Sequence, residues 1–143
     1  MEQYFALLRQ CPLFQGISPQ ELSQMLPCLG TRHMQVKKHQ MIFRAGDPAR
    51  WVGLVLSGAV HVIQEDYYGN RSIVSTFQPP QLFGEAFACA GVASLPVSVE
   101  AAQDSTLLLL DCQRVIRTCS DACAFHQRLL SNLLHVVAAK NLL

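Results

Sequence analysis

The sequence has few charged residues and no concentration of either sign. Of its 143 residues 15% are charged, with 11 Lys and Arg against 10 Asp and Glu, so the formal net charge is only +1. No block of basic residues forms the stripe or patch with which nucleic-acid-binding domains contact phosphates. We therefore expect that this chain by itself does not bind DNA or RNA.

Long hydrophobic runs are also missing, although half of the residues are hydrophobic. No run approaches the roughly 18 consecutive apolar residues that a membrane-spanning helix needs. The first residues, Met1 to Tyr4, lack the pattern of a signal peptide. We expect a soluble, cytoplasmic protein with no membrane partner, and reduced cysteines at positions 11, 28, 89, 112, 119 and 123.

Catalytic motifs are absent as well. The sequence contains no P-loop, nucleophile elbow or pair of catalytic carboxylates, so we predict neither enzymatic activity nor a cofactor. A metal-dependent jelly-roll enzyme of the cupin type would need two histidines on one strand. His33, His39 and His61 are isolated and no His-x-His occurs, so we interpret them as ordinary strand or surface residues.

Short elements dominate the pattern of the chain, which is the length of one domain. Residues 2–10 predict a short amphipathic helix, and the capping box of residues 18–21 begins a second one. From residue 31 the apolar residues recur with a period of two, and turn signals separate about eight short strands. This pattern predicts a mainly β fold with flanking helices, a jelly-roll barrel or double-stranded β-helix.

Residues 82–98 interrupt the run of strands. Pro79-Pro80 ends the preceding strand, and Gly84-Glu85 begins a short alanine-rich helix. Because a helix N-terminus presents unpaired backbone N–H groups and glycine permits close approach, this is a candidate anion or hydroxyl site. The alternative is that Phe83 and Phe87 simply fill the barrel and Gly84 serves only a turn.

The pattern Phe83-Gly84-Glu85-Ala86, followed about ten residues later by Pro96-Val97-Ser98, resembles the phosphate-binding cassette of cyclic-nucleotide-binding domains in the CRP/FNR family of bacterial transcription regulators. Other segments match in order and spacing across nearly the whole chain: Cys11 to Ser18, Ile42 to Ala49, Leu56 to Val60, Gly69-Asn70 and a closing helix. The resemblance implies an effector-sensing domain over residues 1–143. Such a domain forms a homodimer, binds a small-molecule effector, and reaches DNA only through a C-terminal helix-turn-helix domain that this sequence lacks.

The same resemblance assigns roles within the cassette. Gly84 would offer its backbone N–H, Glu85 would accept a hydrogen bond from a ribose hydroxyl, and Ser98 would donate one to the phosphate. Val97 stands where the family has an arginine that makes a charge-assisted contact to the phosphate, and residues 72–113 contain no Lys or Arg. We therefore expect an effector other than a standard cyclic nucleotide.

The expected pocket is apolar, which suits a small, weakly polar or aromatic effector. We predict that the cassette and the long helix line it together, and that the effector contacts are Gly84, Glu85, Ala86, Val97, Ser98, Leu129 and Asn132. The alternative is a vestigial pocket that side chains fill.

The last segment, residues 121–143, predicts the start of a long dimerisation helix. It carries two neighbouring apolar stripes, more than is needed to cover its own barrel. The first consists of Phe125, Leu129, Leu133 and Val136, and the second of Leu130, Leu134 and Val137. We assign the first stripe to the homodimer interface, with burial of both stripes in one domain as the alternative. The apolar end at Leu142-Leu143 suggests a truncated helix.

Cys119, Cys123 and His126 are a second candidate site, for a thiol-based or metal-based redox sensor. On one continuous helix they would share a face at positions i, i+4 and i+7, which a soft metal could use. Ser120-Asp121 is expected to interrupt the helix there, and small buried cysteines are common in cores. We therefore favour a structural role and predict no metal site.

Overall fold

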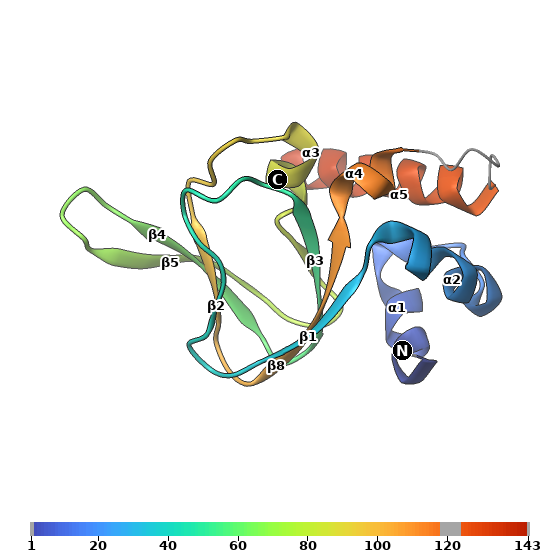
Figure 1. Cartoon of the computed structure of the whole chain (residues 1–143), viewed down its shortest axis with the longest axis horizontal. Coiled ribbons are helices and arrows are strands. Elements are labelled where there is room, and N and C mark those ends of the chain that lie inside the picture. The colour runs from blue at the N-terminus through green and yellow to red at the C-terminus, as the bar shows by residue number, and fades with distance from the viewer. Residues whose placement is uncertain (1, 118–123, 143) are drawn as a thin grey trace.

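Two antiparallel sheets form the centre of the computed structural model, which describes residues 2–117 and 124–142 (Figure 1). One sheet has the order β1-β8-β3-β6, with β1 Arg32–Val36, β8 Ser105–Asp111, β3 Trp51–Ser57 and β6 Leu82–Phe83. The other has the order β2-β7-β4-β5, with β2 Met41–Phe43, β7 Ser98–Ala101, β4 Val60–Glu65 and β5 Arg71–Phe77. The mainly β, jelly-roll prediction is confirmed. Within the described residues no strand of one sheet pairs with the other sheet, so the jelly roll consists of two facing sheets and is not a closed barrel.

The continuous apolar runs of β3 and β8 arise because both faces of these central strands are covered. On β8, Leu108 and Leu110 pack among the residues of the helices, whereas Leu107 and Leu109 pack between the two sheets. All seven residues of β8 are buried. A strand buried on both faces loses the alternation of polar and apolar residues that marks a half-exposed strand, and this explains the run of four leucines.

Short helices flank the first sheet, as predicted, and one long helix follows the strands (Figure 1). The helices are η1 Glu2–Tyr4, α1 Phe5–Gln10, η2 Pro12–Phe14, α2 Pro19–Met25, η3 Leu26–Leu29, α3 Glu85–Ala90, α4 Cys112–Ile116 and α5 Ala124–Asn141. The predicted capping box begins α2: Ser18 Oγ accepts the N–H of Glu21 at 3.2 Å, and Glu21 Oε1 accepts the N–H of Ser18 at 3.1 Å. These bonds to Ser18 lower the pKa of Glu21.

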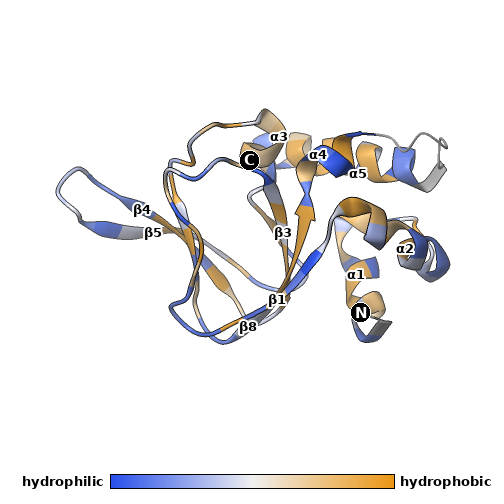
Figure 2. Ribbon diagram, in the orientation of Figure 1, coloured by the Kyte–Doolittle hydropathy of each residue, from blue (hydrophilic) through white to orange (hydrophobic). Residues whose placement is uncertain are grey.

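Helix α5 packs its first apolar stripe into the protein's own core. Leu129, Leu133 and Val136 are 0%, 3% and 8% exposed and share a cluster with side chains of the N-terminal helices. Figure 2 shows hydrophobic segments on α5 and on the strand β3. The assignment of this stripe to a homodimer interface is therefore corrected, because the chain itself covers it. The side chain of Phe125 lies outside the described part of the structure.

Asn132 fixes the rotation of α5. Its Nδ2 donates to the backbone oxygens of Leu13 and Gln15, each at 2.9 Å, so this face of the helix is held against η2. The second stripe consequently points outward, with Leu134 72% exposed. Burial of both stripes within one domain is thus also excluded.

Gly53 gives the first testable prediction. A Cβ at this position in β3 would lie 2.2 Å from Cζ of Phe83, a fully buried ring in β6. Overpacking of a core typically costs about 1–3 kcal/mol, so we expect Gly53→Ala to lower the free energy of unfolding by about that amount in urea denaturation.

The matched control shortens the opposing side chain. In the double variant Gly53→Ala with Phe83→Leu, the leucine lacks the ring atoms that meet the new Cβ. We expect the double variant to lose less stability than the sum of the two single variants. Strict additivity would show that the contact between residues 53 and 83 is not the cause.

Candidate ligand-binding site

A cavity of about 350 Å³ opens between the two sheets. Strands β1, β3 and β8 of one sheet and β2 of the other contribute to its wall, together with the loop before β3 and two residues of the cassette. The apolar part of the lining consists of Met34, Ile42, Phe43, Pro48, Ala49, Trp51, Leu95 and Leu109. The volume is at the lower end of the range of about 300–1,000 Å³ for small-molecule sites, so the cavity suits a small ligand.

Two residues of the cassette reach the cavity: Gly84, which was predicted, and Leu95, which was not. Gly84 has the left-handed backbone angle φ of +77° and precedes the six-residue helix α3. A Cβ on Gly84 would lie 3.3 Å from the backbone oxygen of Trp51, so glycine is needed for both conformation and space. Ala86 is exposed and Val97 is half-buried, and neither lines the cavity.

Leu95, rather than Val97, is therefore the cassette side chain at the position where a ligand would be contacted. Its backbone is fixed by two hydrogen bonds, from its N–H to the oxygen of Asp47 at 2.8 Å and from the N–H of Gly46 to its oxygen at 2.9 Å. Leu95 is 7% exposed. The loop before β7 has no regular period, so counting residues from the motif could not show which side chain points inward.

Glu85 faces the end of α5 instead of the cavity. Its side chain is 4% exposed and forms an ion pair through Oε1 with Nζ of Lys140. Lys140 Nζ also donates to the backbone oxygen of Leu82 at 3.2 Å and lies 5.2 Å from the ring centre of Phe77. Glu85 Oε2 is buried and has no hydrogen-bond partner among the described residues. No local sequence pattern indicates this pair, because the two residues are 55 positions apart.

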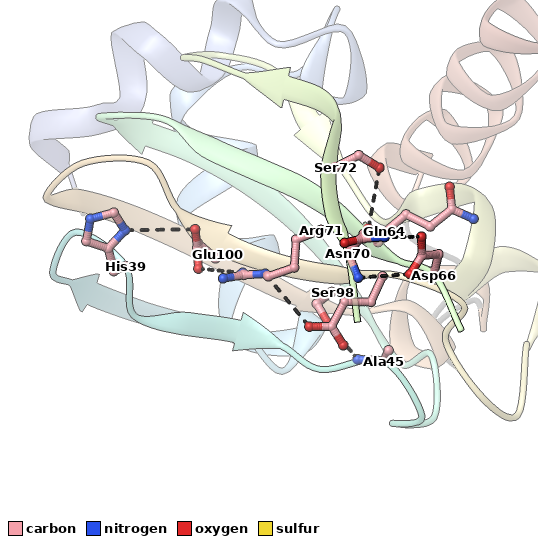
Figure 3. Close-up of polar contacts among 10 residues, drawn as sticks. His39, Ala45, Gln64, Asp66, Asn70, Arg71, Ser72, Ser98 and Glu100 are labelled. Carbon is pink, nitrogen blue, oxygen red and sulfur yellow. Dashed lines mark hydrogen bonds and ion pairs between the residues drawn. The ribbon is translucent and has the colours of Figure 1, made fainter. Parts of the chain in front are cut away.

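The hydroxyl of Ser98 is also engaged by the chain itself. Ser98 Oγ accepts the N–H of Ala45 at 2.9 Å, which joins the start of β7 to the loop after β2 (Figure 3). Glu100, on the same strand, forms an ion pair with Arg71 (Oε2 to Nη2, 3.1 Å), and its Oε1 lies 3.9 Å from Nδ1 of His39. Both contacts are drawn in Figure 3. Both polar side chains on this strand thus serve to hold neighbouring segments together.

The two predicted contacts from the long helix lie elsewhere. Leu129 is completely buried against the N-terminal helices, and Asn132 binds the backbone of η2. Neither lines the cavity. These two assignments are corrected, because the docking of α5 on the N-terminal segment turns both side chains toward that segment.

Two arginines that the sequence analysis did not consider lie at the cavity. The guanidinium carbons of Arg32 and Arg50 lie 4.8 Å and 4.7 Å from the ring centre of Trp51, which is cation–π distance. Arg50 is also paired with Asp111 Oδ2 at 3.0 Å. The alternation of β1 could have revealed Arg32, since residues 32 and 34 share a face and Met34 faces inward.

The second candidate site is only partly described. Cys119 and Cys123 lie outside the described residues. His126 is buried, and its Nε2 lies 3.0 Å from the backbone oxygen of Val115, which gives the ring a structural partner. Across residues 2–117 and 124–142, no group of three or more His, Cys, Asp or Glu side chains is arranged to hold a metal ion. In the same ranges no helix is both long and apolar enough to cross a bilayer.

Comparison with solved structures gives several matches over nearly the whole chain. The Thermus thermophilus catabolite activator protein is 26% identical, with a TM-score of 0.71 over 92% of this chain and 58% of that chain. The sensor domain of the transcriptional regulator DNR from Pseudomonas aeruginosa is 22% identical, with a TM-score of 0.75 over 98% of this chain and 94% of that one. The regulatory subunit of a cAMP-independent protein kinase A from Trypanosoma brucei is 19% identical, with a TM-score of 0.76 over 99% of this chain and 47% of that one.

The comparison by sequence gives the family. No curated protein matches significantly. Residues 33–121 match the sequence family described as the cyclic nucleotide-binding domain, and this segment is more than half of the chain. It includes the cassette and the whole wall of the cavity apart from Arg32. The resemblance to CRP/FNR-type sensor domains is thereby confirmed, and the chain belongs to the cyclic nucleotide-binding domain family.

Proposed function

We propose that this domain is the effector-sensing part of a CRP/FNR-type transcription regulator and that its effector is a small, largely apolar molecule instead of a standard cyclic nucleotide. One observation carries the second half of the proposal. Ser98 and Glu85, the polar cassette side chains that the resemblance assigns to a nucleotide, are engaged by Ala45 and Lys140. The cassette side chain that does line the cavity is the apolar Leu95.

The electrostatics of the cavity support the same conclusion. A cyclic phosphate carries a full negative charge, and burying an unpaired charge costs several kcal/mol. Of the two arginines at the cavity, Arg50 is already paired with Asp111 and Arg32 lies over the ring of Trp51, and Asp47 also lines the cavity. A nucleotide would therefore lack the charge-assisted contact that the family obtains from the cassette, whereas an apolar effector needs none.

One of the structural neighbours is described in terms of its independence from cAMP. The Trypanosoma brucei regulatory subunit is described as cAMP-independent. A triple variant of the same protein, in which one change replaces a threonine by arginine, is described as bound to cAMP in its A site. For the present chain, this comparison supports the proposal that the cassette does not bind a cyclic nucleotide, because the cassette has no suitable cation.

Coupling of the cavity to α5 is proposed to run through Gly84 and Glu85. Gly84 lines the cavity, and the next residue holds Lys140 in the last turn of α5. A ligand that displaces the backbone at Gly84 shifts Glu85 and so changes the free energy of the ion pair. A ligand with different affinities for the docked and released states of the helix would shift the population between them.

We also propose that the domain forms a homodimer through the outward stripe of α5. Leu134 is largely exposed, and Leu130 and Val137, one turn away on either side, are half-buried. An apolar stripe of this kind on a surface helix is well matched by the same stripe of a second copy.

The ligand proposal is tested by a thermal-shift titration with cAMP, cGMP, and a panel of small aromatic acids and phenols. A ligand present at about 100 times its Kd stabilises the folded state by about 2.7 kcal/mol. We expect no shift of the midpoint with either nucleotide and a rise with at least one aromatic compound. A rise with cAMP in the unmodified chain would contradict the proposal.

Two arginine variants test which cassette position faces the ligand. We expect Leu95→Arg to gain a cAMP-dependent rise in the midpoint, because an arginine there can extend into the cavity. Val97→Arg is the matched control and should gain none, since residue 97 does not line the cavity. A cAMP-dependent rise in Val97→Arg but not in Leu95→Arg would show that residue 97 faces the ligand.

The contact between α5 and the cassette is tested by Lys140→Met. The variant leaves the carboxylate of Glu85 buried without its cation, so we expect a loss of about 2 kcal/mol in urea denaturation. This is less than the 3–5 kcal/mol of a fully buried pair because the Lys140 side chain is 43% exposed. Adding Glu85→Gln should restore part of the loss, and Lys38→Met on the surface is the control. A double variant no more stable than Lys140→Met would show that the pair carries no coupling.

The dimer is tested by Leu134→Asp, with the mass measured by light scattering. We expect the unmodified chain to be a dimer and the variant to be a folded monomer. Leu133→Asp should instead unfold the protein, because Leu133 is 3% exposed in the core. A dimeric Leu134→Asp variant would place the interface on another surface.

A further inference from the structure

Two thiols meet where the cassette helix α3 packs against α4, two helices that lie side by side in Figure 1. Cys89 is in the last turn of α3, and Cys112 is the first residue of α4. Their Sγ atoms are 3.8 Å apart, although 23 positions separate them in the sequence. Neither cysteine lines the ligand cavity, and the contact does not depend on the proposed effector.

The two thiols differ in exposure and in acidity. Cys89 is half-buried, whereas Cys112 is 1% exposed. A hydrogen bond from the Cys112 thiol lowers the pKa of Cys89, against the opposing effects of burial and of Glu85. The same hydrogen bond, together with burial, raises the pKa of Cys112. Cys89 is therefore the thiol that ionises first and that a small molecule in solvent can reach.

We propose that Cys89 and Cys112 are a redox-active pair that a hydroperoxide converts into a disulfide. The Cys89 thiolate attacks the terminal oxygen of the hydroperoxide, an S–O bond forms as the O–O bond breaks, and the alkoxide, or hydroxide from hydrogen peroxide, leaves and takes up the proton that Cys89 released. Cys112 then attacks the sulfenic acid of Cys89, the S–S bond forms, and the hydroxyl leaves as water with the proton of Cys112. The two cysteines lose two electrons and two protons, and the hydroperoxide is reduced.

The disulfide would join two helices that lie next to cavity-lining residues. A disulfide requires an S–S distance of about 2.05 Å, so the two side chains, or helices α3 and α4 themselves, must move closer together. Helix α3 begins directly after Gly84, which lines the cavity, and Cys112 directly follows Asp111, which binds Arg50 at the cavity. Oxidation at this pair therefore acts on the backbone segments that shape the site.

The other described cysteines are suited to serve as controls. Cys11 is buried, and burial raises the pKa of its thiol to about 11, so it is not expected to react. Cys28 is exposed on η3. Its oxidation shows how an ordinary surface thiol reacts with the oxidant. Cys28→Ser removes this thiol without changing the core.

The test treats the purified full chain with hydrogen peroxide and measures the intact mass without reductant. We expect a loss of two hydrogens, a peptide map that joins the segments of Cys89 and Cys112, and reversal by dithiothreitol. Cys112→Ser should stop at the sulfenic acid of Cys89, detected as a dimedone adduct, and Cys89→Ser should abolish the mass loss. Thermal midpoints confirm that both variants fold.

Three results would overturn the proposal. The first is an unchanged oxidation pattern in Cys89→Ser. The second is a disulfide that maps to Cys119 and Cys123, and the third is a disulfide between chains that Cys28→Ser abolishes. If Cys89 and Cys112 form the disulfide, the Cys28→Ser variant still loses two hydrogens within one chain.

Discussion

The buried carboxylate of Glu85 ties the ligand cavity to the long helix. One of its oxygens has no hydrogen-bond partner among the described residues, and the ion pair of the other oxygen with Lys140 compensates the buried charge. Burying a carboxylate without a cation is strongly unfavourable. The positions of the last turn of α5 and of the start of α3 therefore depend on each other. Because Lys140 also contacts Leu82 and Phe77, one side chain connects the helix to both sheets.

The specificity of the cavity follows from which polar groups the chain already uses. Hydrogen bonds within the cassette stabilise the loops around the site, and the same bonds remove those groups from ligand recognition. A nucleotide would have to compete with Ala45 for Ser98 and with Lys140 for Glu85. The apolar surface of the cavity is not engaged in this way, so it is available to contact a ligand. On the function proposed above, a fold that is shared with nucleotide-binding relatives would serve a different ligand chemistry without any change in its backbone plan.

Most of the fold could be predicted because its signals are local. The period of two, the capping box at Ser18 and the turn residues each determine a short segment. The rotation of α5 could not be predicted, since two adjacent stripes are equally apolar and the choice rests on Asn132 binding the distant backbone of η2. The ligand-facing position was also beyond the sequence, because Leu95 lies in an irregular loop. Arg32 was within reach of the pattern, since alternation along β1 places it beside Met34.

Trp51 gives the site an optical property of its own. It is the one tryptophan of the chain, it lines the cavity, and two guanidinium groups lie near its ring. The emission of an indole depends on the charges and the water around it. The tryptophan fluorescence of this protein therefore originates at the cavity alone, and a ligand that enters the cavity is expected to change it without any attached label.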